Sequence, residues 1–150
     1  MRLSLQVHYA ICGIFDLAYN GHGRAVQVRV IGERQGIPGR YLEQIFRRLR
    51  QAGLVAGKRG PGGGYRLSRS PAAITLLEIV EAVEGPLQKA SRMQSSSGSA
   101  EENYRPDFLW SELSSNFSEV LSDVSLESLC RQAAVEGVVR FQTDSLEYQI

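Results

Sequence analysis

The stretch from Ile37 to Leu67 constrains the fold of this chain more than any other part of its sequence. Four apolar residues recur there at the spacing of one face of an α-helix: Leu42, Ile45, Phe46 and Leu49. This spacing predicts an amphipathic helix over residues 40–51. The opposite face carries long polar side chains, with a carboxylate at its edge: Arg40, Gln44, Arg47, Gln51 and Glu43. The helix is therefore expected to bury one side and to present guanidinium and carboxamide groups on the other.

A basic hairpin is predicted directly after this helix. The short apolar run Leu54–Ala56 precedes Lys58, Arg59, the turn residues Gly60, Pro61, Gly62, Gly63 and Gly64, and then Tyr65-Arg66-Leu67. A glycine-rich turn between two short strand-like runs is typical of a β-hairpin. A cationic amphipathic helix followed by a basic hairpin is the layout of a winged helix-turn-helix, a fold that binds DNA.

Each of these features also has a simpler interpretation. An arginine-rich helix face is often only a solvated surface, and a glycine-rich turn is more often a turn than a phosphate cradle. The turn lacks the Gly-Lys-Ser/Thr ending of a P-loop, and Tyr65 stands where a dinucleotide-binding motif needs its last glycine. The close succession of helix, breaker, strand and basic wing favours DNA binding over these alternatives.

Charge is divided unevenly along the chain. Residues 1–84 hold 12 Arg and Lys against 6 Asp and Glu, whereas residues 85–150 hold 5 against 10. This asymmetry predicts a nucleic-acid-binding half and a second half with another role. The apolar runs are far shorter than the roughly 20 residues that span a bilayer, and no signal peptide is visible. We therefore expect a cytoplasmic protein without a membrane partner.

The basic half, residues 1–84, is expected to form one DNA-binding domain. A first helix is predicted over Leu5–Tyr19, with Cys12 as a small buried residue of its apolar face, and a second over Val26–Arg34. Pro38 suits the first position of the next helix. Thr75 and Glu78 form a capping box, which predicts a helix from there to about Glu84.

The acidic half is expected to contain a linker, a long helix and a tail. Residues 85–106, which include a serine run, are predicted to be a flexible loop. Residues 107–135 are predicted to hold a helix over Asp107–Val124 and a shorter one capped by Ser125, while the tail 136–150 is expected to be loosely ordered. The long helix carries one apolar stripe: Leu109, Leu113, Phe117, Val120 and Val124. That stripe fits either core packing or a dimer interface.

Several segments together carry a specific pattern: Met1–Ser4, Tyr9-Ala10, Glu33–Ile37, Tyr41–Phe46, Leu49-Arg50 and the wing Arg59–Tyr65. In these segments the chain resembles the Rrf2 family of bacterial transcription regulators. The match is dense over residues 1–84 and thinner through Leu109-Trp110, Leu113 and Ser125-Leu126. The fold that this resemblance implies is mainly α, with a small β-hairpin wing on a helix-turn-helix and a long dimerisation helix.

The resemblance also implies a homodimer that binds double-stranded DNA at a palindromic operator. Each recognition helix would read bases through Arg40, Glu43 and Gln44, with Arg47 on the same face, while Tyr41 and Arg2 would contact the backbone. The wing would reach the minor groove through its tip: Arg59, Gly60, Pro61, Gly62, Gly63, Gly64 and Tyr65. The dimer interface would be the stripe on the long helix.

Iron-sulfur members of this family carry three loop cysteines and often a further ligand before the long helix. Here those positions hold Arg92, Gly98 and Tyr104, with Asp107 before the helix. The two cysteines of the chain, Cys12 and Cys130, lie elsewhere and far apart. We therefore expect no cofactor and no metal in this chain.

The resulting expectation is a DNA-binding transcription regulator that acts as a repressor. An alternative is a regulator controlled by a metabolic enzyme or another protein that docks on the acidic half, and a small-molecule effector is a further alternative. No paired acid and base, metal-ligand spacing or activated nucleophile is visible, so the sequence gives no support to an enzyme.

Overall fold

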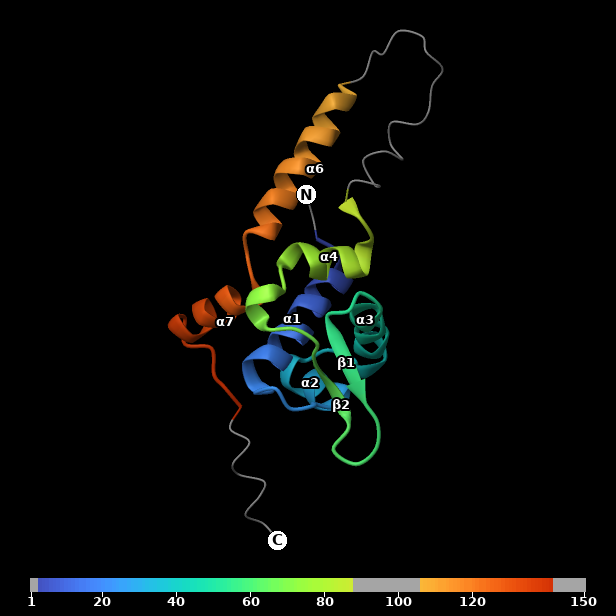
Figure 1. Cartoon of the computed structure of the whole chain (residues 1–150), viewed down its shortest axis with the longest axis vertical. Coiled ribbons are helices and arrows are strands. Elements are labelled where there is room, and N and C mark those ends of the chain that lie inside the picture. The colour runs from blue at the N-terminus through green and yellow to red at the C-terminus, as the bar shows by residue number, and fades with distance from the viewer. Residues whose placement is uncertain (1–2, 88–105, 142–150) are drawn as a thin grey trace.

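A computed structural model describes residues 3–87 and 106–141 of the chain. The fold is mainly α with one antiparallel two-stranded hairpin, as predicted (Figure 1). Helix α1 (Leu5–Asn20) lies at the centre and contacts four other helices: α2 (Val28–Gln35), α3 (Gly39–Gln51), α4 (Leu76–Glu84) and α7 (Leu126–Val135). The core therefore forms around α1.

Helix α1 begins at Ser4, whose hydroxyl accepts a hydrogen bond from the backbone N–H of Val7 and so caps the helix. The residues it buries in the core include Val7, Ala10, Ile14 and Leu17. The prediction that Cys12 is buried is wrong, because the residue is exposed. Cys12 lies about half a turn round the helix from the stripe of Val7, Ala10, Ile14 and Leu17, and so points away from the core that these residues enter.

The helix-turn-helix consists of α2 and α3, with the turn between them at Gly36. Gly36 adopts a left-handed conformation (φ 66°) that ends α2 and suits glycine. The predicted start of α2 at Val26 is wrong by two residues, since Val26 pairs with the hairpin instead. Pro38 is extended (ψ 130°) and precedes the first helical residue, Gly39, rather than being that residue.

The wing is formed by β1 (Val55–Lys58) and β2 (Gly64–Leu67). Its register pairs Val55 with Leu67 and Lys58 with Gly64. Tyr65 also exchanges two backbone hydrogen bonds with Val26, each 2.8 Å long, so the start of β2, next to the turn, is tied to the residues that lead into α2. A Cβ on Gly64 would lie 2.3 Å from the carbonyl oxygen of Val26. The pairing therefore requires glycine at this position.

The predicted capping box is present at the start of α4. Thr75 accepts a hydrogen bond from the N–H of Glu78, and the Glu78 carboxylate accepts one from the N–H of Thr75 at 3.0 Å. Partial burial raises the pKa of Glu78, but the Thr75 N–H and Arg69 outweigh it and hold this pKa below its ordinary value. A single 3-10 turn, Pro71–Ala73, links the wing to this cap.

Helix α6 (Asp107–Ser122) follows and extends away from the rest of the domain (Figure 1). It ends two residues before the predicted Val124. The carbonyl of Val124 instead accepts a hydrogen bond from the N–H of Leu76 at 2.9 Å, which ties the connection to the start of α4. Ser125 caps α7 as predicted, with its hydroxyl accepting from the N–H of Ser128.

The residues after α7 return to the far end of α1. The Tyr19 hydroxyl donates to the carbonyl of Val138 at 2.8 Å, and the N–H of Phe141 donates to Asn20 Oδ1 at 2.8 Å. The prediction of a loosely ordered tail is therefore wrong for 138–141. The apolar residues of this segment show no regular spacing in the sequence, because the segment forms no helix or strand and is held by side chains of α1. The rest of the predicted tail, 142–150, lies outside the described residues.

Replacing Gly64 by alanine should destabilise the protein by about 1–3 kcal/mol, the usual range for a strained backbone position. The added Cβ would meet the Val26 carbonyl, and φ of 139° is unfavourable for an L side chain. Gly39→Ala is the matched control, because nothing lies within 4 Å of a Cβ there and φ is not positive. Urea unfolding should show a loss for Gly64→Ala and no loss for Gly39→Ala. Equal stability of both variants would contradict the assigned role of Gly64.

Candidate nucleic-acid interface

The outer face of α3 presents every polar residue that the sequence predicts for DNA contact on this helix. Arg40, Tyr41, Glu43, Gln44 and Arg47 are all exposed, whereas the four apolar residues of the same helix are buried. The guanidinium carbon of Arg40 lies 4.8 Å from the centre of the Tyr41 ring, and its Nη2 donates to the Tyr41 hydroxyl at 3.1 Å. This stacking pre-orients Arg40.

The charges on this face have no ion-pair partner among the described residues. The carboxylates of the helix-turn-helix pair elsewhere: Glu33 with Arg29 at 2.9 Å, and Asp16 with Arg34. Arg40 and Arg47 therefore remain available to phosphates or base edges, and Glu43 remains an unneutralised carboxylate beside them.

The wing residues divide into an exposed tip and a packed segment at the start of β2. Arg59, Gly60, Pro61 and Gly62 are exposed, whereas Gly63 is buried and both Gly64 and Tyr65 are partly buried. The Tyr65 ring packs 5.1 Å from the ring of Phe46, centre to centre. Of the predicted wing contacts, the structure thus presents the tip on the surface and uses Gly63, Gly64 and Tyr65 to hold the tip in place. Arg2 lies outside the described residues.

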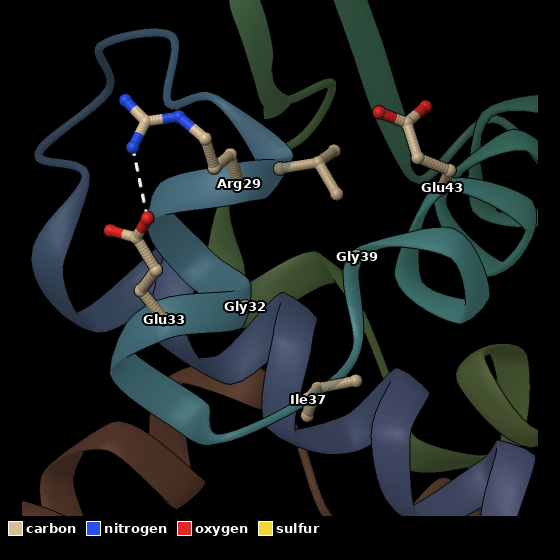
Figure 2. Close-up of a pocket in the computed structure, with 7 residues that line it drawn as sticks. Arg29, Gly32, Glu33, Ile37, Gly39 and Glu43 are labelled. Atoms are coloured by element: carbon tan, nitrogen blue, oxygen red, sulfur yellow. Dashed lines mark hydrogen bonds and ion pairs between the residues drawn. The ribbon is translucent and has the colours of Figure 1, made fainter.

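A pocket of about 240 Å³ lies between α2 and α3 (Figure 2). Val28, Gly32, Ile37 and Gly39 form part of its wall, and charged residues line the rest: Arg29, Glu33 and Glu43. Figure 2 shows the paired Arg29 and Glu33 on the α2 side and Glu43 on the α3 side. The pocket separates Glu43 from the Arg29–Glu33 ion pair, which leaves that carboxylate free at the edge of the recognition face.

Sequence reasoning missed a buried polar cluster behind the helix-turn-helix. Asp16 is fully buried and accepts hydrogen bonds from Arg34, from Gln35 at 2.9 Å and from Asn20 at 3.3 Å. Arg34 and Gln35 are the last residues of α2, directly before the turn at Gly36. The signal in the sequence was one carboxylate within the otherwise apolar run Ile14–Ala18. Such a buried carboxylate needs partners, and α2 supplies them.

A large apolar surface is exposed on α6. Its members are Phe108 (73% exposed), Leu109, Trp110, Leu113 and Val120. Of the predicted dimer-interface residues, Leu109, Leu113 and Val120 are exposed, and Phe117 and Val124 are partly buried. Monomeric proteins rarely expose an apolar patch of this kind without a binding role.

The two cysteines lie on different helices, Cys12 on α1 and Cys130 on α7. Desolvation raises the pKa of both thiols. Within residues 3–87 and 106–141, no group of three or more His, Cys, Asp or Glu side chains is placed to hold a metal ion. The loop positions Arg92, Gly98 and Tyr104 lie outside this part of the chain, and Asp107 is in the first turn of α6. No helix in the described residues is both long enough and apolar enough to span a bilayer.

Comparison with known families agrees with this geometry. Residues 3–132 match the Rrf2 family, described as an iron-dependent transcriptional regulator. The chain belongs to the Rrf2 family. The resemblance found in the sequence is thereby confirmed, and members of this family are DNA-binding transcription regulators, not enzymes.

Individual relatives span nearly the whole chain. The HTH-type transcriptional regulator IscR of Xenorhabdus nematophila is 38% identical over 139 residues, which cover 92% of this chain and 84% of that protein. Among solved structures, T. potens IscR aligns with a TM-score of 0.74 and 31% identity over 94% of each chain. CymR, the global cysteine regulator of B. subtilis, aligns with a TM-score of 0.71 and 30% identity, covering 88% of this chain and 98% of CymR.

Proposed function

We propose that this Rrf2-family regulator binds a palindromic operator as a homodimer and represses transcription without an iron-sulfur cluster of its own. The observation that carries the DNA-binding part is the outer face of α3, where arginines with no carboxylate partner among the described residues flank exposed Gln44 and Glu43. The basic wing is held against the same helix, because Tyr65 packs on Phe46 on the buried side of α3. In this proposal residues 1–84 form the DNA-binding domain, and a repressor acts by occupying the site.

The proposed contacts divide by chemistry. Arg40 and Gln44 donate to base edges in the major groove, where arginine suits guanine and a carboxamide suits adenine. Glu43 accepts from cytosine N4 and repels phosphates and wrong bases. Arg47, Tyr41 and Arg2 contact the backbone. Arg59 and the glycine tip approach the minor groove, since glycines leave room for close approach of a backbone.

Loss of Arg59 should weaken binding to all DNA sequences and make it less sensitive to salt. Each phosphate contact contributes about −0.9 to the slope of log affinity against log salt, so Arg59→Ala should reduce the slope by roughly that amount. Arg131→Ala removes the same charge from α7, where Arg131 pairs with Glu127, and should leave the slope unchanged. Fluorescence anisotropy across a salt series gives both values.

Glu43→Ala should instead change which sequences are bound. Removing the carboxylate relieves repulsion of incorrect bases, so sites rejected by the wild type become acceptable. Selection from random DNA with each variant measures this directly. Uniform weakening across all sequences by Glu43→Ala, with no altered preference, would refute this division of roles.

The homodimer is proposed to form through α6. The exposed apolar stripe of Leu109, Leu113 and Val120 lies along one face of a helix that extends from the body of the domain. Two copies that buried these stripes against each other would remove apolar surface from water at about 25 cal/mol per Å². A two-fold dimer would also present two recognition helices to a palindromic site.

Leu113→Arg should therefore give a folded monomer with poor operator affinity, because it places a charge in the proposed interface. Ser115→Arg is the matched control: it adds the same charge to α6, but about 200° round the helix from Leu113, on the other face. Sedimentation velocity should show a dimer for wild type and Ser115→Arg and a monomer for Leu113→Arg. A wild-type monomer at micromolar concentration would rule out the proposed dimer.

The absence of a cluster is proposed from the chemistry of the residues present. Iron-sulfur clusters are held chiefly by cysteine thiolates, and this chain has only Cys12 and Cys130, both with a raised pKa. Their positions in the sequence offer no ligand spacing. Asp107, at the position before the long helix, offers a hard oxygen rather than a thiolate.

Protein purified without oxygen should accordingly be colourless and contain neither stoichiometric iron nor acid-labile sulfide. The double variant Cys12→Ser, Cys130→Ser should bind operator DNA as the wild type does, because neither thiol has a role in binding. Visible absorbance, iron and sulfide assays and anisotropy test these points. A brown protein with near-stoichiometric iron and sulfide would show the proposal to be wrong.

The signal is then proposed to be a small molecule or a partner protein acting on the acidic half. Exposed apolar residues lie there as well, among them Val135 (79% exposed). Co-purification of one stoichiometric protein would favour the docked-partner alternative.

A further inference from the structure

We infer that the segment Val138–Phe141 is a positioning element for DNA recognition, which holds the helix-turn-helix from behind through Arg34. The inference rests on the DNA-binding role proposed for α3. It concerns residues outside the recognition face and outside the apolar stripe of α6. Its basis is the set of contacts that join this segment, α1 and the end of α2.

The first part of the argument is the buried Asp16. Its side chain is inaccessible to solvent, and the paired Arg34 side chain is only 12% exposed. Three side chains donate to the carboxylate, and two of them, Arg34 and Gln35, come from the last turn of α2. Charge-assisted hydrogen bonds are among the strongest in proteins, so this cluster fixes the end of α2 against α1.

The second part is the way in which the C-terminal segment closes this cluster. Asn20, which donates to Asp16, also accepts the hydrogen bond from the N–H of Phe141 at 2.8 Å. The Phe141 ring lies 5.2 Å from the guanidinium carbon of Arg34, within the range of a cation–π contact. Phe141 thus contacts both the donor and the cation that hold Asp16.

Two further contacts anchor the segment. The Tyr19 hydroxyl donates to the carbonyl of Val138 at 2.8 Å, and the guanidinium carbon of Arg140 lies 4.3 Å from the Tyr19 ring. Tyr19 itself is buried, so it provides a fixed platform. Residues 138–141 are therefore held at both ends, whereas the Val139 side chain between them is 84% exposed and has no described contact of this kind.

The connection to DNA follows from chain geometry. Arg34 and Gln35 precede the turn at Gly36, and α3 begins at Gly39, three residues later. A shift at the end of α2 is therefore transmitted through a very short turn to Arg40 in the first turn of the recognition helix. Because base readout depends on the placement of such side chains, a loosened end of α2 reduces specific binding more than general attraction to phosphates.

Phe141 is also suited to a test that separates positioning from stability. Its side chain is 59% exposed, so little buried area is lost when the ring is removed. Coupling between two sites is reciprocal. If docking of the segment strengthens operator binding, operator binding must therefore strengthen docking of the segment. The N–H of Phe141 reports this docking because Asn20 accepts its hydrogen bond.

The experiment uses the full chain and an operator selected from random DNA with the wild-type protein. Phe141→Ala should lower operator affinity by about five-fold or more, the lower end of typical couplings between sites. Phe141→Tyr keeps an aromatic ring over Arg34 and should retain affinity, and Val139→Ala should behave as wild type. Non-specific affinity and the salt slope should be the same in all four proteins, and the melting temperatures should agree closely.

Hydrogen exchange of the wild type supplies the second readout. The N–H of Phe141 should exchange more slowly when the operator is bound. The inference would be overturned if Phe141→Ala bound the operator as tightly as wild type, or if Val139→Ala lost as much affinity as Phe141→Ala. It would also be overturned if operator binding left the exchange rate of the Phe141 N–H unchanged. Failure of the wild type to select any operator would instead refute the proposed function, so the two outcomes are distinguishable.

Discussion

The close contact between α1 and α3 at Gly13 determines where the recognition helix lies. A Cβ at Gly13 would be 3.0 Å from both Leu42 and Phe46, so these side chains lie directly against the α1 backbone. Phe46 is fully buried and also packs on Tyr65, which ties the wing to Val26. One apolar contact therefore sets the positions of the recognition helix, the wing and the entry to α2. A close-packed interior of this kind transmits small displacements instead of absorbing them.

This packing allows the molecule to use its arginines in two different ways. Behind the helix-turn-helix, Arg34 is nearly buried and paired with Asp16, and its role is to hold α2. On the outer face, Arg40 and Arg47 follow Arg34 by only 6 and 13 residues, yet both are exposed and have no carboxylate partner among the described residues. Breaking a buried pair leaves an uncompensated charge and typically costs 3–5 kcal/mol, whereas an exposed arginine contributes little to stability. Stability thus depends on Arg34, whereas Arg40 and Arg47 are left for the proposed contacts with DNA.

The features that the sequence predicted correctly are those governed by neighbouring residues. The stripe of α3, the glycine turn of the wing and the capping box at Thr75 each depend on side chains within a few positions. The apolar stripe of α3 also predicts where the candidate site lies, since the polar residues of this helix must face away from the stripe. Their contacts with DNA, and the interface along α6, remain predictions.

The features that sequence reasoning missed depend on distant residues. Cys12 was expected in the core because α1 is apolar on several sides, but only the arrangement of the other helices decides which side is covered. Val26 has the composition of a helix residue, yet Tyr65, far along the chain, pairs with it. The apolar residues of segment 138–141 have no regular spacing, and its hydrogen-bond partners, Tyr19 and Asn20, lie on the distant helix α1. Its own sequence therefore shows no sign that it is held in place.

These distant contacts meet on α1, which binds α3 and α4 near its first end and residues 138–141 of the acidic half at its second end. At the first end, Ser4 bonds Glu84 of α4, and Gln6 accepts a hydrogen bond from Arg48 of α3 at 3.0 Å. The same Arg48 guanidinium donates to the carbonyl of Val83 near the end of α4, which in turn contacts α6. At the second end, Tyr19 and Asn20 hold residues 138–141.

Contacts therefore link α6 and the C-terminal segment to α3 by separate routes, one through Arg48 and one through Arg34. Contiguity alone does not establish coupling, which requires that both sites bias the same two-state element. The turn between α2 and α3 is the element that the Arg34 route meets, because its position is set by the carboxylate of Asp16 on one side and by the apolar contact at Gly13 on the other. A signal that acted on either half could alter DNA affinity without touching a residue that contacts DNA.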